Sequence, residues 1–135
     1  MMDLDGFKPV NDQHGHDVGD ELLVAVTRRL QGHVRQSDVV ARLGGDEFVV
    51  MAGHMSSTQQ AHELGLKLLD AFRLPFSLGS IQVHVGLTVG YAIAPDDSSD
   101  AAGLLKLADA AMYSGKQSGK FCLRRNTGDL ALSSA

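Results

Sequence analysis

The run Gly44-Gly45-Asp46-Glu47-Phe48 combines residue types that suit the chemistry of metal ions and phosphates. Apolar residues flank it on both sides, and a Gly-Gly step between strand-like runs is typical of a hairpin turn, because both glycines accept a positive φ. The two acids therefore follow directly at the hairpin tip. Carboxylates beside bare glycine backbone suit a divalent cation and the phosphates that it carries. The alternative is an acidic turn that only faces solvent.

Two more acids, Asp3 and Asp5, stand at the end of the first predicted strand. Side chains alternate along a strand, so both are expected on the same side, with Leu4 on the other. A carboxylate at a strand end and near a helix start is well placed for Mg²⁺. Acids near a terminus are also commonly just solvated, and these two alone do not decide between the readings.

The segment 6–20 is crowded with Gly, Asn, Asp and His. Asn11 offers a donor and an acceptor together, and Asp20 can accept two N–H groups from one ligand, so the pair matches the edge of a guanine. Lys8 and the backbone N–H groups near Phe7 suit a triphosphate. The alternative for Asp20 is a helix N-cap or an acid in the first helical turn, which leaves Asn11 unexplained.

Near the other end of the chain, Lys116 and Lys120 are four residues apart and share a helix face if the helix persists that far. The residues alone favour a solvated helix end, where cations suit the helix dipole.

Hydrophobic spacing indicates how these residues are positioned. A hairpin in the middle of alternating helices and strands predicts a mixed sheet with helices packed on it, rather than a doubly wound parallel sheet. Periodicity and turn residues predict a strand at 1–4, a short helix or turn through 7–10, a loop with Gly15 and Gly19, a helix at 20–34, hairpin strands at 38–43 and 48–52, a helix capped by Ser56 and Gln59 and ending before Pro75, one or two strands within 81–94, a helix around 104–112 and a strand at 121–124.

The bulk properties describe an ordinary globular domain. The chain has 135 residues, of which 44% are hydrophobic and 21% charged, enough for one domain with one core. The formal net charge of −4 disfavours general binding of nucleic acid. The single cysteine, Cys122, excludes an internal disulfide, and no apolar run is long enough for a bilayer. We expect a cytoplasmic domain, whose parent protein could still be anchored in a membrane.

Together these pieces resemble the GGDEF domain of bacterial diguanylate cyclases. The resemblance implies an α+β fold, with a central, mostly antiparallel five-stranded sheet wrapped by helices, related to nucleotide cyclases and polymerase palm domains. It covers nearly the whole chain and depends on several motifs in order: Asp-Leu-Asp-Gly-Phe-Lys at 3–8, Asn11-Asp12, Gly15-His16, Gly19-Asp20, Ala-Arg-Leu-Gly-Gly-Asp-Glu-Phe at 41–48, Thr88-Val89-Gly90, and Ala-Asp-Ala-Ala-Met-Tyr at 108–113 followed by Lys116.

The resemblance implies a specific reaction. Each domain binds one GTP, two domains meet face to face as a homodimer, and each 3′-hydroxyl attacks the α-phosphate of the other GTP to give cyclic di-GMP and pyrophosphate. By the same analogy Mg²⁺ (or Mn²⁺) is bound by Asp3, the Leu4 carbonyl, Asp46 and Glu47. We expect Asp46 to accept the hydroxyl proton. Neighbouring strand residues point to opposite faces, so Asp46 and Glu47 should differ in role unless the hairpin tip bends.

The family also implies binding roles for other residues. Asn11 and Asp20 correspond to the guanine readers, and the phosphate side comprises Phe7, Lys8, His16, Lys116 and Lys120. Lys120 stands where the family usually has arginine, which keeps the charge but loses the bidentate fork.

Arg35 and Asp38 match the Arg-x-x-Asp motif of an allosteric cyclic di-GMP site that inhibits the enzyme. Without the family frame, they are better explained as a local ion pair in a loop, which contributes little to stability.

The match departs from the family at the start of the chain. We expect a domain over 1–125 that lacks the family's N-terminal helix and part of its first strand, and a flexible tail over 126–135. The parent chain is expected to carry sensory or phosphodiesterase domains. Two alternatives to the cyclase are a non-catalytic module that binds GTP or cyclic di-GMP and regulates a partner domain, and an inactive fragment of a larger signalling protein.

Overall fold

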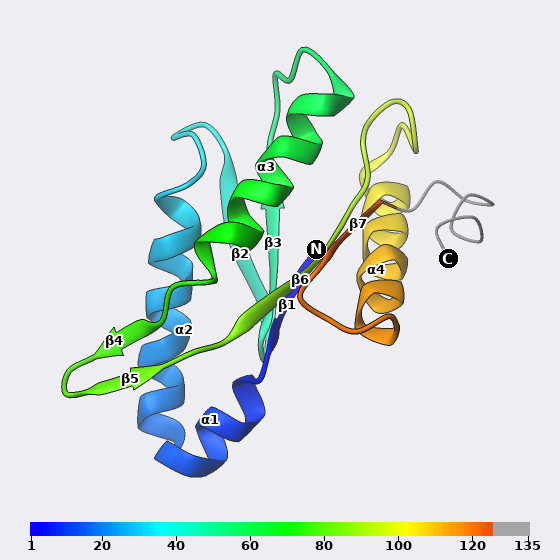
Figure 1. The fold of residues 1–135 in the computed structure, drawn as a ribbon. Helices are drawn as coiled ribbons and strands as arrows, with labels where there is room; N and C mark the ends of the chain where they lie inside the picture. The colour runs from blue at the N-terminus through cyan, green and yellow to red at the C-terminus, as the bar shows by residue number, and fades with distance from the viewer. Residues whose placement is uncertain (126–135) are drawn as a thin grey trace.

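The computed structural model describes residues 1–125, so the tail predicted over 126–135 lies outside the described residues. The chain alternates short strands and helices and ends on a strand next to the last helix (Figure 1). In chain order the elements are β1 (Met2–Asp5), α1 (Phe7–His14), α2 (His16–Gln31), β2 (Val39–Gly44), β3 (Glu47–Met51), α3 (Thr58–Ala71), β4 (Phe76–Leu78), β5 (Ile81–Val83), β6 (Gly86–Tyr91), α4 (Ala101–Gln117) and β7 (Leu123–Arg125).

The main sheet has five strands in the order β2-β3-β1-β6-β7. Every neighbouring pair is antiparallel except β6 and β7, which run parallel. β1 is the central strand, and its residues Asp3 and Asp5 pair with Thr88 and Gly86 of β6. The predicted α+β fold with a central, mostly antiparallel five-stranded sheet is confirmed.

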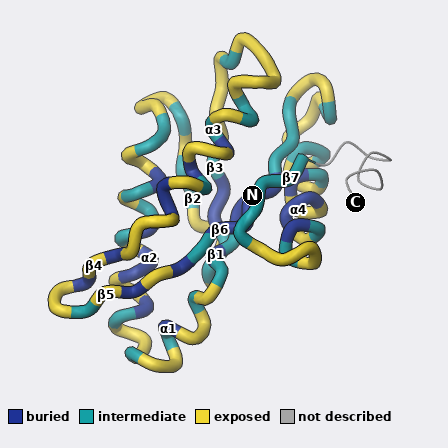
Figure 2. The backbone as a smooth tube through the Cα atoms, in the orientation of Figure 1, coloured by how far each residue is buried: buried dark blue, intermediate teal, exposed yellow. Residues whose placement is uncertain are grey.

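The two faces of the sheet bury different sets of side chains. One face packs the large core with α2 and α3, and its buried members include Met2, Leu4, Leu22, Phe48 and Phe72. The other face lies against α4, where the backbone of β6 approaches the helix directly. Because side chains alternate along β1, Asp3 and Asp5 point to the α4 side of the sheet. Figure 2 shows the buried residues following the strands and the inner sides of the helices.

The hairpin β2–β3 turns as its glycines predict. Gly44 has φ 146° and Gly45 has φ 52°, conformations that are costly for residues with a side chain. The pairing register shifts between Arg42 and Gly44, so the tip is irregular and Gly44 lies opposite Glu47. The tip therefore bends where the two acids enter β3, which the regular alternation of a strand does not describe.

The largest differences from the prediction concern α2, α3 and β4. Helix α2 begins at His16 and ends at Gln31, not over 20–34, because Gly15 takes φ 92° and lets the second helix start at once. Helix α3 is capped by Ser57, whose hydroxyl accepts the Gln60 N–H at 3.3 Å, one residue later than predicted. Strands β5 and β6 both lie within the predicted range 81–94, but β4 was not predicted; β4 and β5 form a separate two-stranded sheet that turns at Gly79, which has φ 65°.

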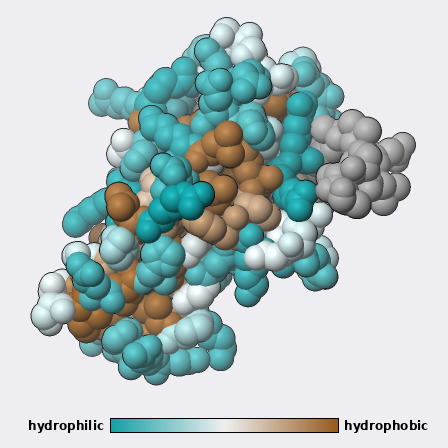
Figure 3. All heavy atoms as spheres, viewed as in Figure 1, coloured by the Kyte–Doolittle hydropathy of each residue, from teal (hydrophilic) through white to brown (hydrophobic). Residues whose placement is uncertain are grey.

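The surface seen in Figure 3 is mostly hydrophilic, with apolar atoms gathered near the centre of the view and over β4 and β5. None of the helices within residues 1–125 has both the length and the apolar character that crossing a bilayer requires.

Candidate functional site

Asp3, on the central strand, is a partly buried carboxylate surrounded by other charges. It lies opposite Glu47 in the β1–β3 ladder, and the next residue, Leu4, donates its N–H to the Asp46 carbonyl at 3.1 Å. Burial and then the neighbouring Asp46 carboxylate raise the pKa of Asp3 to about 6, although the Lys116 ammonium opposes the rise. The structure thus brings the predicted strand acid and the hairpin tip together.

The donor atoms around Asp3 fit a cation. Its Oδ1 is buried and finds no hydrogen-bond partner among residues 1–125, and a divalent ion would satisfy such an oxygen. Yet no three Asp, Glu, His or Cys side chains of the described residues lie close enough to one another to hold an ion. The Asp46 and Glu47 carboxylates lie near enough to Asp3 to raise its pKa, but the expected group of three carboxylates around one ion position is not formed among residues 1–125. Water or phosphate oxygens would have to complete the ligand set.

Asp5 is held by a network that joins four elements. Its carboxylate accepts the Thr88 hydroxyl at 2.8 Å, the Phe121 N–H at 2.9 Å and the Lys116 ammonium at 2.7 Å. The Asp5 side chain is only 11% exposed, and Thr88 is fully buried. Gly86 lies opposite Asp5 in the ladder, and a Cβ there would stand 3.4 Å from Asp5 Oδ2 and 3.1 Å from the Phe121 ring.

Lys116 reaches β1 from the last full turn of α4. Its Nζ is 2.7 Å from Asp5 Oδ1, 3.3 Å from the Leu4 carbonyl oxygen and 3.7 Å from Asp3 Oδ2. The close approach of α4 depends on Gly115, where a Cβ would meet Thr88 Cγ2 at 2.9 Å. Lys116 is therefore placed among the predicted metal ligands, while Gly115, which lowers helix propensity, is needed for packing.

Lys120 does not share a helix face with Lys116. Helix α4 ends at Gln117, and Lys120 is an exposed residue with φ 66° in the turn before β7. The condition for a shared face, a helix that persists to Lys120, is not met, because α4 ends at Gln117 and the chain turns at Gly119 before β7 pairs with β6.

Asn11 and His16 meet where α1 and α2 adjoin. Asn11 Nδ2 lies 3.0 Å from His16 Nδ1. Gly19 is buried in the helix–helix contact, where a Cβ would collide with Asn11 Oδ1, approach Asn11 Cγ to 3.1 Å and reach the Phe7 ring at 3.5 Å. Gly19 is thus part of α2 rather than a loop glycine, and it leaves the space that the Asn11 amide occupies.

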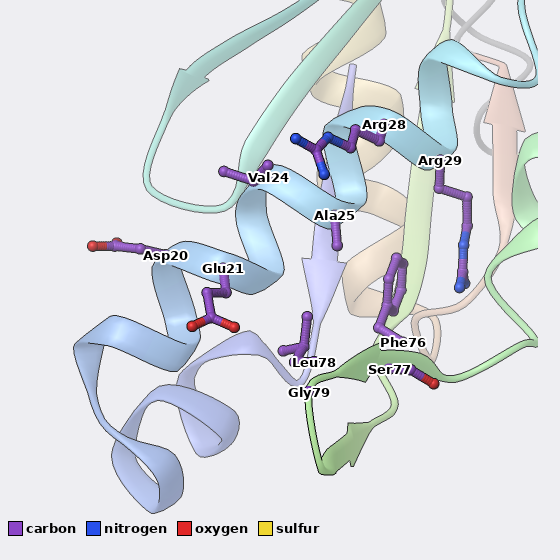
Figure 4. A pocket seen from close by; sticks show the side chains of 10 residues that line it. All are labelled: Asp20, Glu21, Val24, Ala25, Arg28, Arg29, Phe76, Ser77, Leu78 and Gly79. Atoms are coloured by element: carbon purple, nitrogen blue, oxygen red, sulfur yellow. The ribbon is translucent and has the colours of Figure 1, made fainter.

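Asp20 is exposed inside α2, so it is neither the N-cap, which is Gly15, nor a residue of the first turn. It lies at the rim of an open hollow of about 610 Å³ between α2 and the β4–β5 hairpin. In Figure 4 its carboxylate points away from Phe76 and Leu78, while Glu21 lies nearer the hairpin. Neither Asp3 nor Asn11 lines this hollow, so it is separate from the acids on β1.

Lys8 is exposed and pairs with Asp12 at 3.3 Å.

Arg35 and Asp38 form a tight local pair after α2. Asp38 Oδ2 accepts the Arg35 backbone N–H at 2.9 Å, and Oδ1 lies 3.3 Å from the guanidinium. Burial raises the pKa of Asp38, but the hydrogen bonds and charge of Arg35 outweigh it and hold that pKa below its usual range. The guanidinium also donates to the Gly53 carbonyl, although its side chain remains 49% exposed. The pair borders a hollow of about 400 Å³ that Gln31, Val34 and Val40 also line.

Sequence reasoning placed Asp5 at the strand end as a carboxylate suited to Mg²⁺, while the family resemblance gave it no role, and Thr88 was used only as part of a motif. The contacts among Asp5, Thr88, Lys116 and Phe121 join residues 33 to 116 positions apart, so no local pattern reveals them. The one available signal was alternation along β1, which places Asp3 and Asp5 on the same face.

Comparison with known proteins agrees with this geometry. The profile of the family described as "Diguanylate cyclase, GGDEF domain" matches residues 1–122. The chain is 42% identical over 125 residues to the cyclic di-GMP phosphodiesterase PdeR of Escherichia coli, covering 90% of this chain and 19% of that protein. It is 41% identical over 120 residues to the bifunctional diguanylate cyclase/cyclic di-GMP phosphodiesterase MucR of Pseudomonas aeruginosa, covering 89% and 17%.

Solved structures show the same fold. The GGDEF domain of TpbB from Pseudomonas aeruginosa superimposes with a TM-score of 0.89 at 37% identity, over 93% of this chain and 78% of that one. The active GGEEF domain of a diguanylate cyclase from Vibrio cholerae gives 0.79 at 26% identity, over 95% and 81%. The chain spans about a fifth of the length of PdeR and MucR, so it corresponds to one region of those longer proteins.

Proposed function

Because the chain belongs to the GGDEF family of diguanylate cyclase domains, we propose that it condenses two GTP molecules into cyclic di-GMP. The observation that carries the proposal is the pairing of Asp3 with the hairpin tip, which places an unpartnered, buried carboxylate oxygen beside Asp46 and Lys116. Carboxylates with an adjacent cation suit a metal-bound triphosphate.

In this proposal Asp3, the Leu4 carbonyl, Asp46 and Glu47 hold Mg²⁺ or Mn²⁺, which when bound neutralises charge on the phosphates. Asp46 takes the proton of the 3′-hydroxyl. That oxygen forms a bond to the α-phosphorus of the other GTP, while the bond from the α-phosphorus to the bridging oxygen breaks and pyrophosphate leaves. Two such steps close the ring, so two domains must face each other as a homodimer.

Substrate recognition is assigned to the other predicted residues. Asn11 and Asp20 read the guanine edge, with Asn11 held by His16 and given space by Gly19. The phosphate side consists of Phe7, Lys8, His16, Lys116 and Lys120. Of these, Lys116 is the one that the described contacts tie to β1.

Arg35 and Asp38 are proposed as a site for the product, cyclic di-GMP, whose binding inhibits the domain. Supporting this, the Arg35 side chain is half exposed beside a hollow, where a guanidinium can bind phosphate or stack on guanine. We expect Arg35→Ala to bind cyclic di-GMP more weakly by calorimetry, and unchanged affinity would reject this site.

A second candidate is a module that binds nucleotide without turnover and regulates a phosphodiesterase domain on the same parent chain. It is favoured by the absence of a formed three-carboxylate group among residues 1–125 and by the name of PdeR. Retention of Asp3, Asp46 and Glu47 favours the enzyme.

The two candidates differ in turnover. The protein is incubated with GTP and Mg²⁺, and chromatography is used to detect cyclic di-GMP. We expect cyclic di-GMP from the native protein and loss of product in Asp46→Asn. Asp96→Asn, on the exposed loop after β6, is the matched control. Nucleotide binding without product in the full-length protein would favour the regulatory module.

A further inference from the structure

We propose that His16 is a positioning residue for guanine recognition, because its Nδ1 accepts an N–H of Asn11 and so fixes which end of the Asn11 amide faces the base. The inference rests on the proposed function, in which Asn11 is a guanine reader and His16 lies on the phosphate side. It adds that selectivity for the base, and not only affinity for the phosphates, depends on His16.

The contact joins two helices that meet at a single glycine. Helix α1 ends at His14, Gly15 donates its N–H to the Asn11 carbonyl at 2.9 Å, and α2 begins at His16. Within one helix, side chains three or four positions apart are neighbours, and those five apart are not. The break at Gly15, which has φ 92°, is therefore what lets Asn11 Nδ2 and His16 Nδ1 lie 3.0 Å apart.

The two ends of the Asn11 amide have different surroundings. Its nitrogen faces His16, and its oxygen fills the place where a Cβ at position 19 would stand, which Gly19 leaves empty. An amide nitrogen only donates, so Nδ1 of His16 presents its lone pair and the ring proton is on Nε2. His16 is exposed, so this outer N–H is accessible to a phosphate oxygen while Nδ1 holds the amide.

An amide held in one orientation discriminates between bases better than one that is free to turn. Guanine presents N–H donors on the edge where adenine presents a ring acceptor, and turning the amide over exchanges its own donor and acceptor. One hydrogen bond of ordinary net strength corresponds to about a three- to tenfold change in an equilibrium constant. This is the share of the selectivity that we assign to His16.

Two substitutions separate the nitrogens of the ring. An asparagine amide can take the place of Nδ1, and a glutamine amide can take the place of Nε2. His16→Asn thus keeps an acceptor for Asn11, whereas His16→Gln keeps only the outer donor. The measured quantity is the ratio of the Kd for ATP to the Kd for GTP, by calorimetry with their α,β-methylene analogues, which cannot release pyrophosphate. A phosphate contact is common to both nucleotides and cancels in this ratio.

We expect His16→Gln to lower the ratio about three- to tenfold. His16→Asn should keep the ratio within about twofold of the parent value, although it binds both nucleotides more weakly. In an Asn11→Ala background, which itself loses selectivity, His16→Gln should have no further effect on the ratio, because it acts through the amide. His14→Gln, the same substitution at the last residue of α1, is the matched control and should leave the ratio unchanged. Thermal melts show that each variant is folded.

Equal weakening of both nucleotides in His16→Gln would overturn the proposal, because His16 would then act on the phosphates alone. The same loss of selectivity in His16→Asn and His16→Gln would also overturn it, since Nδ1 would not be the group that matters. A ratio that falls in Asn11→Ala but not in His16→Gln would keep Asn11 as the guanine reader and reject only the role of His16. An unchanged ratio in Asn11→Ala would reject the proposed reader, and this inference with it.

Discussion

Gly19→Ala should damage guanine recognition without touching the nucleotide itself. A Cβ at position 19 would collide with Asn11 Oδ1 and lie 3.1 Å from Asn11 Cγ, so the amide has to leave its place beside His16. The helix itself should tolerate the change, because alanine is the better helix former by about 1 kcal/mol.

The size of the effect follows from what the amide contributes. A bidentate contact between an amide and a base edge is worth roughly 1–3 kcal/mol of discrimination, and about 1.4 kcal/mol corresponds to a factor of ten in affinity. We therefore expect Gly19→Ala to weaken binding of GTP with Mg²⁺ about ten- to a hundredfold. Binding of ATP, which does not present the same edge, should change much less.

Calorimetric titration with GTP and with ATP measures both affinities. Gly32→Ala is the matched control, because a Cβ at the end of the same helix meets only the Arg28 and Arg29 carbonyls at an ordinary 3.5 Å. If Gly19→Ala kept the parent's affinity and its preference for GTP, Asn11 could not be the guanine reader.

Three further predictions concern stability. Arg29→Met should lower the free energy of unfolding by about 3 kcal/mol and the Tm by about 10 °C in calorimetry, because its guanidinium donates to three carbonyls and stacks 3.5 Å from Phe76. Asp38, whose pKa is lowered in the folded state, stabilises the fold above its unfolded pKa of about 3.9, and this contribution is lost as the pH falls through the lower folded value. The free energy of unfolding in urea should therefore vary less with pH below pH ~4 in Asp38→Asn than in the parent chain. The same pH dependence in both chains would contradict the pairing with Arg35. Gly90→Ala should cost at least about 3 kcal/mol in urea unfolding, since its Cβ would collide with the backbone of α4; a near-neutral result would mean that α4 sits farther from β6.

Local signals predicted the elements that carry the site. The two glycines specified the hairpin tip, and alternation placed Asp3 and Asp5 on one face of the strand. The register shift between Arg42 and Gly44 does not follow from the regular alternation of a strand, and it makes the hairpin tip irregular just before Asp46 and Glu47.

Long-range contacts account for most of the remainder. Gly115 lowers helix propensity in the local pattern, which does not reveal its buried contact with Thr88 between α4 and β6. Lys120 was expected on the helix face of Lys116 if the helix continued that far. Helix α4 ends at Gln117 instead, and the chain reverses before β7 pairs with β6. Strand β4 and its pairing with β5 were missed because β4 has only three residues, too few for a periodic pattern.

The most direct test of the account is a crystal of this domain with Mn²⁺ and a non-hydrolysable GTP analogue. The account predicts an anomalous manganese peak in contact with the Asp3 carboxylate and the Leu4 carbonyl, with the guanine edge against Asn11 and Asp20. A nucleotide bound elsewhere, or bound here with no metal beside Asp3, would contradict it.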